Sequence, residues 1–329
     1  MTPASYLDLH QEFSSEIEEE IESILERLGP SAESVRSVVA ELLCHQKMKY
    51  PLSVLPLVVH GVETGSPGPA VPLSAVHVLW WTSACYLDDL ADGHGAHTPA
   101  GLTPHEALLA AVVTGHVLSL KAIGSRRIPE PVRGALTDEV LDCGITAAQG
   151  QLGDMRADVG NASRNSVVTA YREKSGAPFG MITAMAAILA GAEAERIDLW
   201  REFGSVFGIL WQMFNDQEDI ASGRNEDLLN GTVTYLFACA LEDAAPDIRP
   251  RILDLHAGAR TSAASRSALT GLLLTPAVLD RYEDDIHKFR DEAHRILGDL
   301  GGDESHLPVL RQLVDQTSRM LVRPEDTAG

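Results

Sequence analysis

The sequence predicts an all-α protein, folded as one helical bundle over residues 1–329. Apolar residues recur at helical spacing along nearly the whole chain, the alternating pattern typical of strands is nearly absent, and Gly- and Pro-rich stretches fall where helices should end. No stretch is long or biased enough to be an interdomain linker, and no repeat of fixed period is present. With 45% hydrophobic residues the chain can bury a substantial core, and one domain is the simplest account.

Ten segments carry the helical pattern, and turn-forming residues separate several of them. The first segment is acidic, the third is apolar until its last turn, and the last carries charges of both signs. Breaks fall at Gly29-Pro30, TGSPGPAVP (64–72), DGHGAHTPAGLTP (92–104), PEP (129–131) and ASGRNEDLLNG (221–231). The predicted helices cover residues 6–28, 32–47, 70–92, 104–124, 130–152, 165–191, 194–221, 229–243, 247–257 and 275–298.

Composition argues against several classes of partner. The formal net charge of −21 disfavours nucleic acid and an anionic membrane surface, because both select clusters of Lys and Arg. The apolar stretch Gly180–Ala192 is shorter than the ~20 residues that a spanning helix needs, and the acidic N-terminus does not look like a signal peptide. The four cysteines lack CxxC spacing, which favours a reducing compartment. We therefore expect a cytoplasmic protein without a membrane span or a nucleic-acid partner.

Three aspartates, Asp88, Asp89 and Asp92, stand directly behind the apolar run of the third predicted helix. Asp88 and Asp92 are four residues apart and share one helix face, where two carboxylates can hold a hard divalent cation together. A solvated acidic helix end is the plainer interpretation. However, the helix dipole disfavours negative charge at a C-terminal end, so a cluster of carboxylates without a function would be energetically unfavourable there.

A second cluster repeats this arrangement. Asn215, Asp216 and Asp219 end the long apolar helix in FGILWQMFNDQEDIASG, and Asn215 and Asp219 are again four residues apart. Two such helices can face each other across a bundle core and hold magnesium between them. Because Mg²⁺ prefers a few carboxylates plus phosphate oxygens, the pattern predicts a diphosphate held at the mouth of an apolar pocket.

These motifs resemble those of the trans-isoprenyl diphosphate synthases, the polyprenyl synthetase family, within the class I terpenoid synthase fold. DDLAD at 88–92 resembles the first aspartate-rich motif of the family, and GILWQMFNDQED at 208–219 resembles the second, with Asn215 in place of its first aspartate. In the expected order fall GQLGD (150–154), EKSGAPF (173–179) and GRNEDLLNGTVTY (223–235). The resemblance covers most of the chain, from HQKMKYP at 45–51 to the final helices, and implies a single-domain bundle of the isoprenoid synthase type.

The resemblance implies three Mg²⁺ ions around the diphosphate. Two of these ions would be held by Asp88, Asp89 and Asp92. The third would be served by Asn215, Asp216 and Asp219.

The resemblance also implies which residues act on the substrate. Lys174 would pair with the diphosphate, and Arg224 would do so from the loop after the second motif. Gln212 and Gln151 match family glutamines near the metal and the pocket, and with Lys174 they are the expected catalytic residues. Elementary chemistry agrees: ionising an allylic diphosphate requires charge neutralisation at the leaving group, and the cation left behind needs a dry apolar cavity.

The chain departs from the family at the site for isopentenyl diphosphate, which the family builds from basic residues. HQKMKYP keeps Lys47, expected to bind substrate, but has Met48 and Tyr50 where the family has arginines. Trp81 stands in the place of a histidine, and residues 93–100 contain none of the family's paired arginines. Each missing charge-assisted contact would forfeit ~1.5–3 kcal/mol. We infer that this site is degraded or converted.

Three residues of the third predicted helix are expected to line the prenyl pocket. Trp81 lies seven residues before Asp88 on the face toward the metal, where an indole can stabilise a carbocation or stack on an aromatic acceptor. Its neighbour Trp80 is expected in the core. Ser83 and Ala84 are small, which would leave the pocket deep enough for a C15 or C20 chain.

We expect an enzyme that ionises an allylic prenyl diphosphate and transfers the prenyl group, either to isopentenyl diphosphate through an altered site or to another acceptor. The alternative is a class I terpene cyclase acting on a C15 or C20 diphosphate, which needs no second anion site. The second motif favours the synthase, since it lacks the serine and later glutamate of typical cyclases. A third hypothesis, a non-catalytic subunit of a heteromeric synthase, is disfavoured because such a subunit has no reason to keep mutually repelling carboxylates.

Two further expectations concern assembly and the remaining polar residues. The family resemblance implies a homodimer. Asp284 and Asp285 lie mid-helix among charges of both signs, a pattern typical of a solvated face, and His94 and His97 in a Gly-rich loop are expected to be solvated too.

Overall fold

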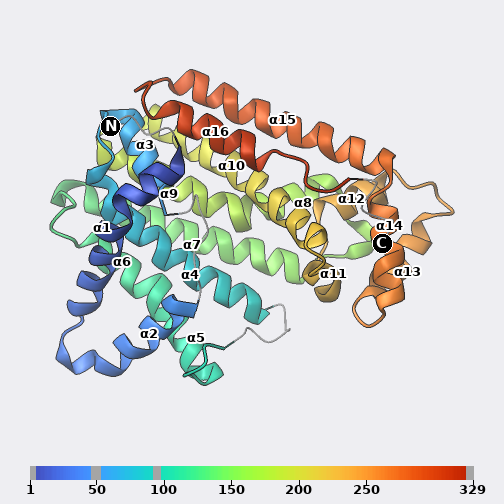
Figure 1. The fold of residues 1–329 in the computed structure, drawn as a ribbon, viewed down its shortest axis with the longest axis horizontal. Helices are drawn as coiled ribbons and strands as arrows, with labels where there is room; N and C mark the ends of the chain where they lie inside the picture. Colours follow the sequence, from blue (N-terminus) through green and yellow to red (C-terminus); the bar gives the residue numbers. More distant parts are fainter. Residues whose placement is uncertain (1–4, 46–52, 92–97, 324–329) are drawn as a thin grey trace. The chain divides into compact units, whose positions relative to one another are not determined.

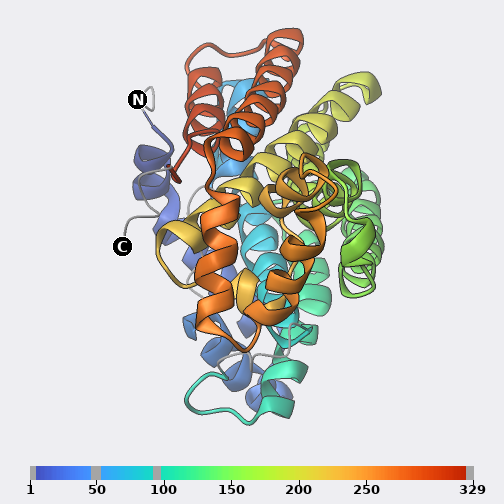
Figure 2. The ribbon, with the colours of Figure 1, turned by 90° about the vertical axis from the view of Figure 1, so that its right-hand side faces the viewer.

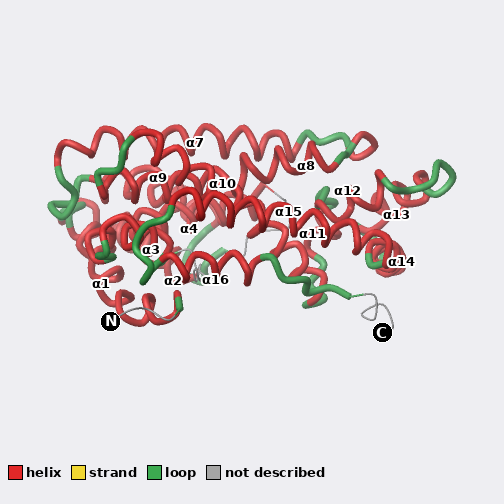
Figure 3. Tube along the Cα trace, turned by 90° about the horizontal axis from the view of Figure 1, so that it is seen from above, coloured by secondary structure: helices red, strands yellow, loops and turns green. Residues whose placement is uncertain are grey.

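The fold is seen in a computed structural model that describes residues 5–45, 53–91 and 98–323 (Figure 1). All regular elements within these ranges are helices (Figure 3), which confirms the predicted all-α class. Two segments are π-helical, η3 (Val113–Leu118) and η6 (Arg172–Gly176). The α-helices are α1 (Tyr6–Glu26), α2 (Glu33–His45), α3 (Leu55–Thr64), α4 (Val71–Ala91), α5 (Pro104–Val112), α6 (Ser119–Ile123), α7 (Arg133–Met155), α8 (Arg164–Tyr171), α9 (Ala177–Ala190), α10 (Ala194–Ala221), α11 (Glu226–Asn230), α12 (Tyr235–Glu242), α13 (Arg249–Ala259), α14 (Ala263–Leu273), α15 (Pro276–Leu300) and α16 (Leu307–Thr317).

Most predicted helices agree with the structure to within a few residues, and the helix predicted over 194–221 coincides with α10. The prediction of one helix over 229–243 is wrong, because this segment forms α11 and α12. Gly231 takes a left-handed φ of +75°, which ends α11. The Thr234 hydroxyl then accepts the N–H of Phe237 and begins α12.

Three helices, α3, α14 and α16, are missing from the prediction. Helix α3 is buried on all sides from Leu55 to Val62, so it has no polar face that would reveal a period. Helix α14 is rich in Ser, Thr and Gly, which are weak helix formers, and it depends on the Ser262 side chain as its N-cap. Helix α16 has an ordinary amphipathic pattern with a buried apolar face.

Contacts divide the chain into two compact units. Unit 1 comprises Met1–Gly144, Pro178–Gly204 and Ile296–Leu313. Unit 2 comprises Ile145–Ala177, Ser205–Arg295 and Val314–Gly329. The single domain expected over 1–329 stays a prediction. The first acidic motif belongs to unit 1 and the second to unit 2.

In unit 1 the apolar helix α4 is the centre of the packing. Helices α1, α3, α5, η3 and α6 all pack against it. A Cβ atom on Gly115 would lie only 2.6 Å from the Cβ of Ser83, so glycine at this position lets η3 approach α4 closely. The small size of Ser83, which is buried, therefore serves this helix contact.

In unit 2 helices α13 and α14 lie side by side (Figure 2), and α8 packs against η6 and α12. Asp285 on α15 is only 6% exposed. Its carboxylate accepts hydrogen bonds from Arg164, Tyr235 and Lys288. The prediction of a solvated Asp285 is therefore wrong, because side chains from α8 and α12 cover it. Its neighbour Asp284 is exposed, as predicted.

Two helical stretches are long and apolar enough to cross a membrane, Gly68–Ala91 and Pro104–Ile123. In the first, 72% of the most apolar window is buried, and in the second 50%. Core helices of soluble proteins have the same length and composition, so the two stretches are weak evidence for a membrane span.

Candidate functional site

The carboxylate of Asp216 is the centre of a polar cluster in unit 2. Asp216 lies on α10 and is 3% exposed. Gln212, one turn earlier, donates its Nε2 hydrogen to Oδ1 over 2.9 Å, and the hydroxyl of Tyr171 donates to Oδ2. The hydroxyl of Ser175 donates to Oε1 of Gln212 over 2.7 Å. Both donors to Asp216 are neutral, so they orient the carboxylate without cancelling its charge.

Close backbone contacts bring these side chains together. A Cβ on Gly208 of α10 would lie 2.6 Å from the carbonyl oxygen of Ser175, and one on Gly150 of α7 would lie 2.8 Å from the main-chain nitrogen of Lys174. The two glycines therefore let α10 and α7 approach the π-helix η6. A π-helical turn is frequent at functional sites, and this one carries both Lys174 and Ser175.

Lys174 is paired in this cluster with Asp154, whose Oδ2 lies 3.2 Å from the ammonium nitrogen. Asp154 comes three residues after Gln151 on α7. The Nε2 atom of Gln151 is buried and has no hydrogen-bond partner within the part of the chain that the structure describes. A buried donor without an acceptor is costly, so Gln151 is available to a ligand oxygen.

Burial also sets the acidity of the cluster. Desolvation raises the pKa of Asp216 to about 6, although hydrogen bonds from Tyr171 and Gln212 and the charge of Lys174 oppose the shift. Desolvation and the charge of Asp216 raise the pKa of Tyr171 well above its ordinary value. At neutral pH the cluster therefore holds a neutral phenol against an ionised carboxylate.

Asp219, the last residue of the second motif, is bound by the first turn of α11. Its Oδ1 accepts the N–H of Glu226 over 3.0 Å and its Oδ2 accepts the N–H of Asp227 over 3.2 Å. The exposed Arg224 side chain lies 3.7 Å from Oδ1, so it is beside the second motif. Asn215 is half-buried on the same helix.

The first motif is described only in part. Asp88 is half-buried and Asp89 is exposed at the end of α4, whereas Asp92 lies outside the described residues, as do Lys47 and the loop histidines. Metal ligation by Asp92 therefore stays a prediction.

The two tryptophans of α4, Trp80 and Trp81, differ in burial. Trp80 is buried in the core, as expected. Trp81 is half-buried, and its ring centroid lies 5.1 Å from Phe179 and 5.8 Å from His77. Ala84 is half-buried further along the helix. Unit 1 thus carries an aromatic cluster before the first motif.

Three residues of the site, Tyr171, Ser175 and Asp154, are missing from the sequence prediction. Asp154 ends the quoted GQLGD stretch, and its spacing from Gln151 places both on one side of α7. This spacing is a signal that could have found it. Ser175 lies in the quoted EKSGAPF stretch directly after Lys174, which is a signal of the same kind. Tyr171 gives no such signal, because a tyrosine within a helical pattern is usually at least partly buried in the core.

The residues of the second motif fit a hard divalent cation. Each oxygen of Asp216 accepts one hydrogen bond and keeps a second lone pair, and Asn215 offers an amide oxygen. Oxygen donors of this kind suit Mg²⁺ or Ca²⁺. Among the described residues no three His, Cys, Asp or Glu side chains are gathered closely enough to hold a metal by themselves. A cation at Asp216 would therefore need further oxygens from substrate or water.

The helical fold is the all-α fold of the isoprenoid synthases. Residues 109–270 match the family model for polyprenyl synthetases. No curated protein matches the sequence. Family and fold together indicate a prenyltransferase.

Three solved structures illustrate the likeness. The polyprenyl synthetase from Streptomyces coelicolor A3(2) has a TM-score of 0.74 at 16% identity, covering 90% of this chain and 95% of that one. The polyprenyl synthase from Caulobacter crescentus CB15, crystallised with calcium and isoprenyl diphosphate, has a TM-score of 0.77 at 17% identity, covering 96% and 97%. The geranylgeranyl pyrophosphate synthase from Corynebacterium glutamicum, crystallised with isoprenyl diphosphate and magnesium, has a TM-score of 0.76 at 16% identity, covering 94% and 98%. At these identities the likeness concerns the fold.

Proposed function

We propose that the protein ionises an allylic prenyl diphosphate with the help of Mg²⁺ and transfers the prenyl group to an acceptor. The observation that carries this proposal is the cluster in unit 2. There Lys174 and Gln151 lie on elements in contact with each other, the Nε2 donor of Gln151 has no partner among the described residues, and Asp216 is held by neutral donors. Related structures that contain calcium or magnesium together with isoprenyl diphosphate support the same ligands.

Each group has a chemical task in this proposal. Bound Mg²⁺, held by Asp216 with Asn215 and by the first motif, would neutralise the charge that builds on the leaving diphosphate. Lys174 would exchange its contact with Asp154 for one with the diphosphate, and Arg224 would close on it from the loop.

The acceptor distinguishes two versions of the proposal. Because the basic residues expected at the site for isopentenyl diphosphate are replaced, we propose that this site is degraded and that another acceptor is used. The half-buried Trp81, which lies beside the buried Phe179, favours a second candidate, a terpene cyclase, since an indole face can stabilise a carbocation during ring closure. In either version the first step, ionisation of the allylic diphosphate, is the same.

The test is incubation of purified protein and Mg²⁺ with geranyl, farnesyl and geranylgeranyl diphosphates, each with and without isopentenyl diphosphate. We expect release of pyrophosphate from at least one of them. A longer diphosphate formed only with isopentenyl diphosphate would overturn the degraded site, and a cyclic hydrocarbon or alcohol from one substrate would establish the cyclase. If no pyrophosphate is released from any allylic diphosphate, even with aromatic acceptors, a non-catalytic subunit is the surviving explanation.

A variant of the unit 2 cluster makes this test specific. Replacing Lys174 with Met should slow pyrophosphate release by about 10- to 100-fold, because one charge-assisted contact to the diphosphate is lost. The matched control is Lys121→Met, since Lys121 lies on α6 in unit 1 and its ammonium group donates to the main-chain oxygen of Arg27. An unchanged rate in Lys174→Met would contradict the assigned role.

We also propose a homodimer. Helix α7 exposes apolar residues at spacings of four, seven and three, which place them along one face: Leu141, Ile145, Leu152 and Met155. The stretch from α5 into η3 exposes a second group, Leu108, Leu109, Val112 and Val117. Exposed apolar surface of this extent is unfavourable in water and typical of a protein interface.

A further inference from the structure

We infer that Tyr171 is a positioning residue that fixes the Asp216 carboxylate for cation binding, with its own hydroxyl aimed by the main chain of Tyr235. This inference rests on the proposed function, because it assigns Tyr171 a part in holding the cation. Tyr171 ends α8 and is buried, and Asp216 lies on α10, so their contact joins two separate helices of unit 2.

The direction of the hydrogen bonds follows from chemistry alone. The main-chain N–H of Tyr235 lies 2.9 Å from the Tyr171 oxygen and can only donate. A carboxylate can only accept, so the single phenolic proton of Tyr171 must go to Oδ2 of Asp216. The hydroxyl therefore has one orientation, and it presents a fixed donor to the carboxylate.

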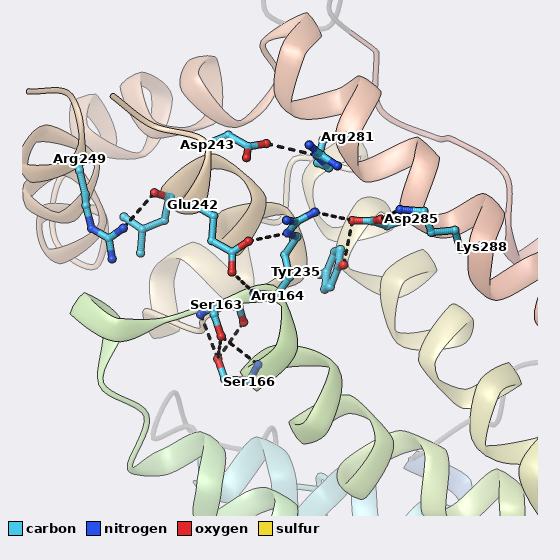
Figure 4. A network of polar contacts seen from close by, with 11 residues as sticks. Ser163, Arg164, Ser166, Tyr235, Glu242, Asp243, Arg249, Arg281, Asp285 and Lys288 are labelled. Carbon is cyan, nitrogen blue, oxygen red and sulfur yellow. Dashed lines mark hydrogen bonds and ion pairs between the residues drawn. The ribbon is translucent and has the colours of Figure 1, made fainter. Parts of the chain in front are cut away.

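The position of Tyr235 is itself fixed by other contacts (Figure 4). Tyr235 is the first residue of α12, where main-chain N–H groups lack partners inside the helix. Its side-chain hydroxyl donates to Asp285 on α15 over 3.0 Å, and Asp285 also accepts from Arg164 over 3.1 Å. Arg164 in turn donates to Glu242 at the end of α12 over 2.6 Å. The two ends of α12 are thus tied to α8 and α15, and the donor that aims Tyr171 cannot swing away.

Two donors restrain the two oxygens of Asp216 in different ways. Gln212 comes from the same helix, one turn earlier, so its contact moves with α10. Tyr171 is the donor from another element, and it sets the rotation of the carboxylate relative to unit 2. Groups that hold a metal ligand in this way typically change metal affinity or activity by about 10- to 100-fold when removed.

The experiment compares Mn²⁺ binding, measured by electron paramagnetic resonance in the presence of inorganic pyrophosphate, in the full-length protein and in Tyr171→Phe. We expect the variant to bind Mn²⁺ about 10-fold or more weakly. The metal concentration for half-maximal turnover should rise by a similar factor, while the KM for the allylic diphosphate at saturating metal changes little.

The matched control is Tyr282→Phe. Tyr282 is also a buried tyrosine of unit 2, but its hydroxyl donates to the main-chain oxygen of Met213 over 2.9 Å. It should lose thermal stability like Tyr171→Phe and keep its Mn²⁺ affinity. If both variants bind Mn²⁺ with equal affinity, the role of Tyr171 is overturned but the proposed function is not. No Mn²⁺ binding in the unaltered protein would overturn the proposed function as well.

Discussion

Asp216 shows at the scale of one residue how a carboxylate can be buried and still be available to a cation. Its burial favours the protonated form, and the neutral donors Tyr171 and Gln212 favour the ionised form. Asp219, three residues later, differs because its oxygens accept main-chain N–H groups from the first turn of α11. Each oxygen of both aspartates accepts one of these hydrogen bonds and keeps a second lone pair, so the two residues differ in their donors and both can serve a cation.

The acidity of Asp216 predicts a pH dependence of stability in metal-free buffer. Its pKa is about 6 in the folded protein, above the ordinary 3.8, so the folded state binds this proton more tightly than the unfolded state. The stabilisation is therefore fully present below about pH 4 and is lost as the pH rises through 6. Between pH 4 and pH 7 the stability of the unaltered protein relative to Asp216→Asn should fall by on the order of 3 kcal/mol. Urea unfolding of both proteins across this range measures the difference, and a constant difference would contradict the assigned environment.

The π-helix η6 is the element on which the site is built. Its packing depends on two neighbouring glycines, which have no side chain. Gly208 of α10 and Gly150 of α7 both lie against the backbone of η6. Since the nearest atoms are main-chain atoms and, at Gly150, also the Cβ of Glu173, none of which moves when a side chain rotates, a larger residue cannot be accommodated by a side-chain rotation.

Replacing Gly208 with Ala should therefore destabilise the protein by about 1–3 kcal/mol, because the added methyl group would force α10 away from η6. The control is Gly144→Ala on α7, where a Cβ meets nothing within 4 Å. That substitution should stabilise the protein by about 0.5–1 kcal/mol, since alanine is the better helix former. Chemical unfolding of both variants compares them. Equal effects would show that the close contact does not limit stability.

The ion pairs that join α8, α12 and α15 contribute differently to the free energy of unfolding, because they differ in how deeply they are buried. Removing the Arg164 side chain by Arg164→Met would deprive the buried Asp285 of one donor, and should cost about 1–3 kcal/mol of unfolding free energy. Arg281→Met is the matched control, because Arg281 pairs with Asp243 at a distance of 3.5 Å where both side chains are well exposed. It should change stability by less than about 1 kcal/mol. Thermal unfolding that ranks the two variants the other way would refute this assignment.

At the scale of the whole molecule, the exposed apolar stripe of α7, formed by Leu141, Ile145, Leu152 and Met155, bears on how the protein assembles. Ile145 is 71% exposed, an unusual position for a large aliphatic side chain in the middle of a helix. In the proposed homodimer this face would be covered by a second copy, which explains its composition.

A charge placed on the stripe should break the dimer. We expect Ile145→Glu to shift the protein from dimer to monomer at micromolar concentration, measured by size-exclusion chromatography with light scattering, because an unpaired carboxylate would be buried at the interface. Leu7→Glu is the control, since Leu7 is 50% exposed on α1 and outside the stripe. A dimer that persists in Ile145→Glu and dissociates in Leu7→Glu would place the interface elsewhere.

The sequence by itself determined the helical class, the position of most helices and the two acidic motifs. Helical periodicity and the spacing of Asp88 from Asp92, or of Asn215 from Asp219, are local properties that the chain carries whatever its tertiary contacts. The family resemblance added Lys174 and the glutamines for the same reason, because these are recognised by their order along the chain. Apolar helices without a polar face, such as α3, were beyond this local signal.

Only the tertiary structure decided which partners these residues have. Tyr171 meets Asp216 across a separation of 45 residues, and Asp285 is buried by Arg164 from a distance of 121 residues. Local spacing says which face of a helix a residue occupies but not which other helix covers that face. A tyrosine in an apolar pattern and an aspartate in a charged one therefore acquired their roles only when distant helices packed together.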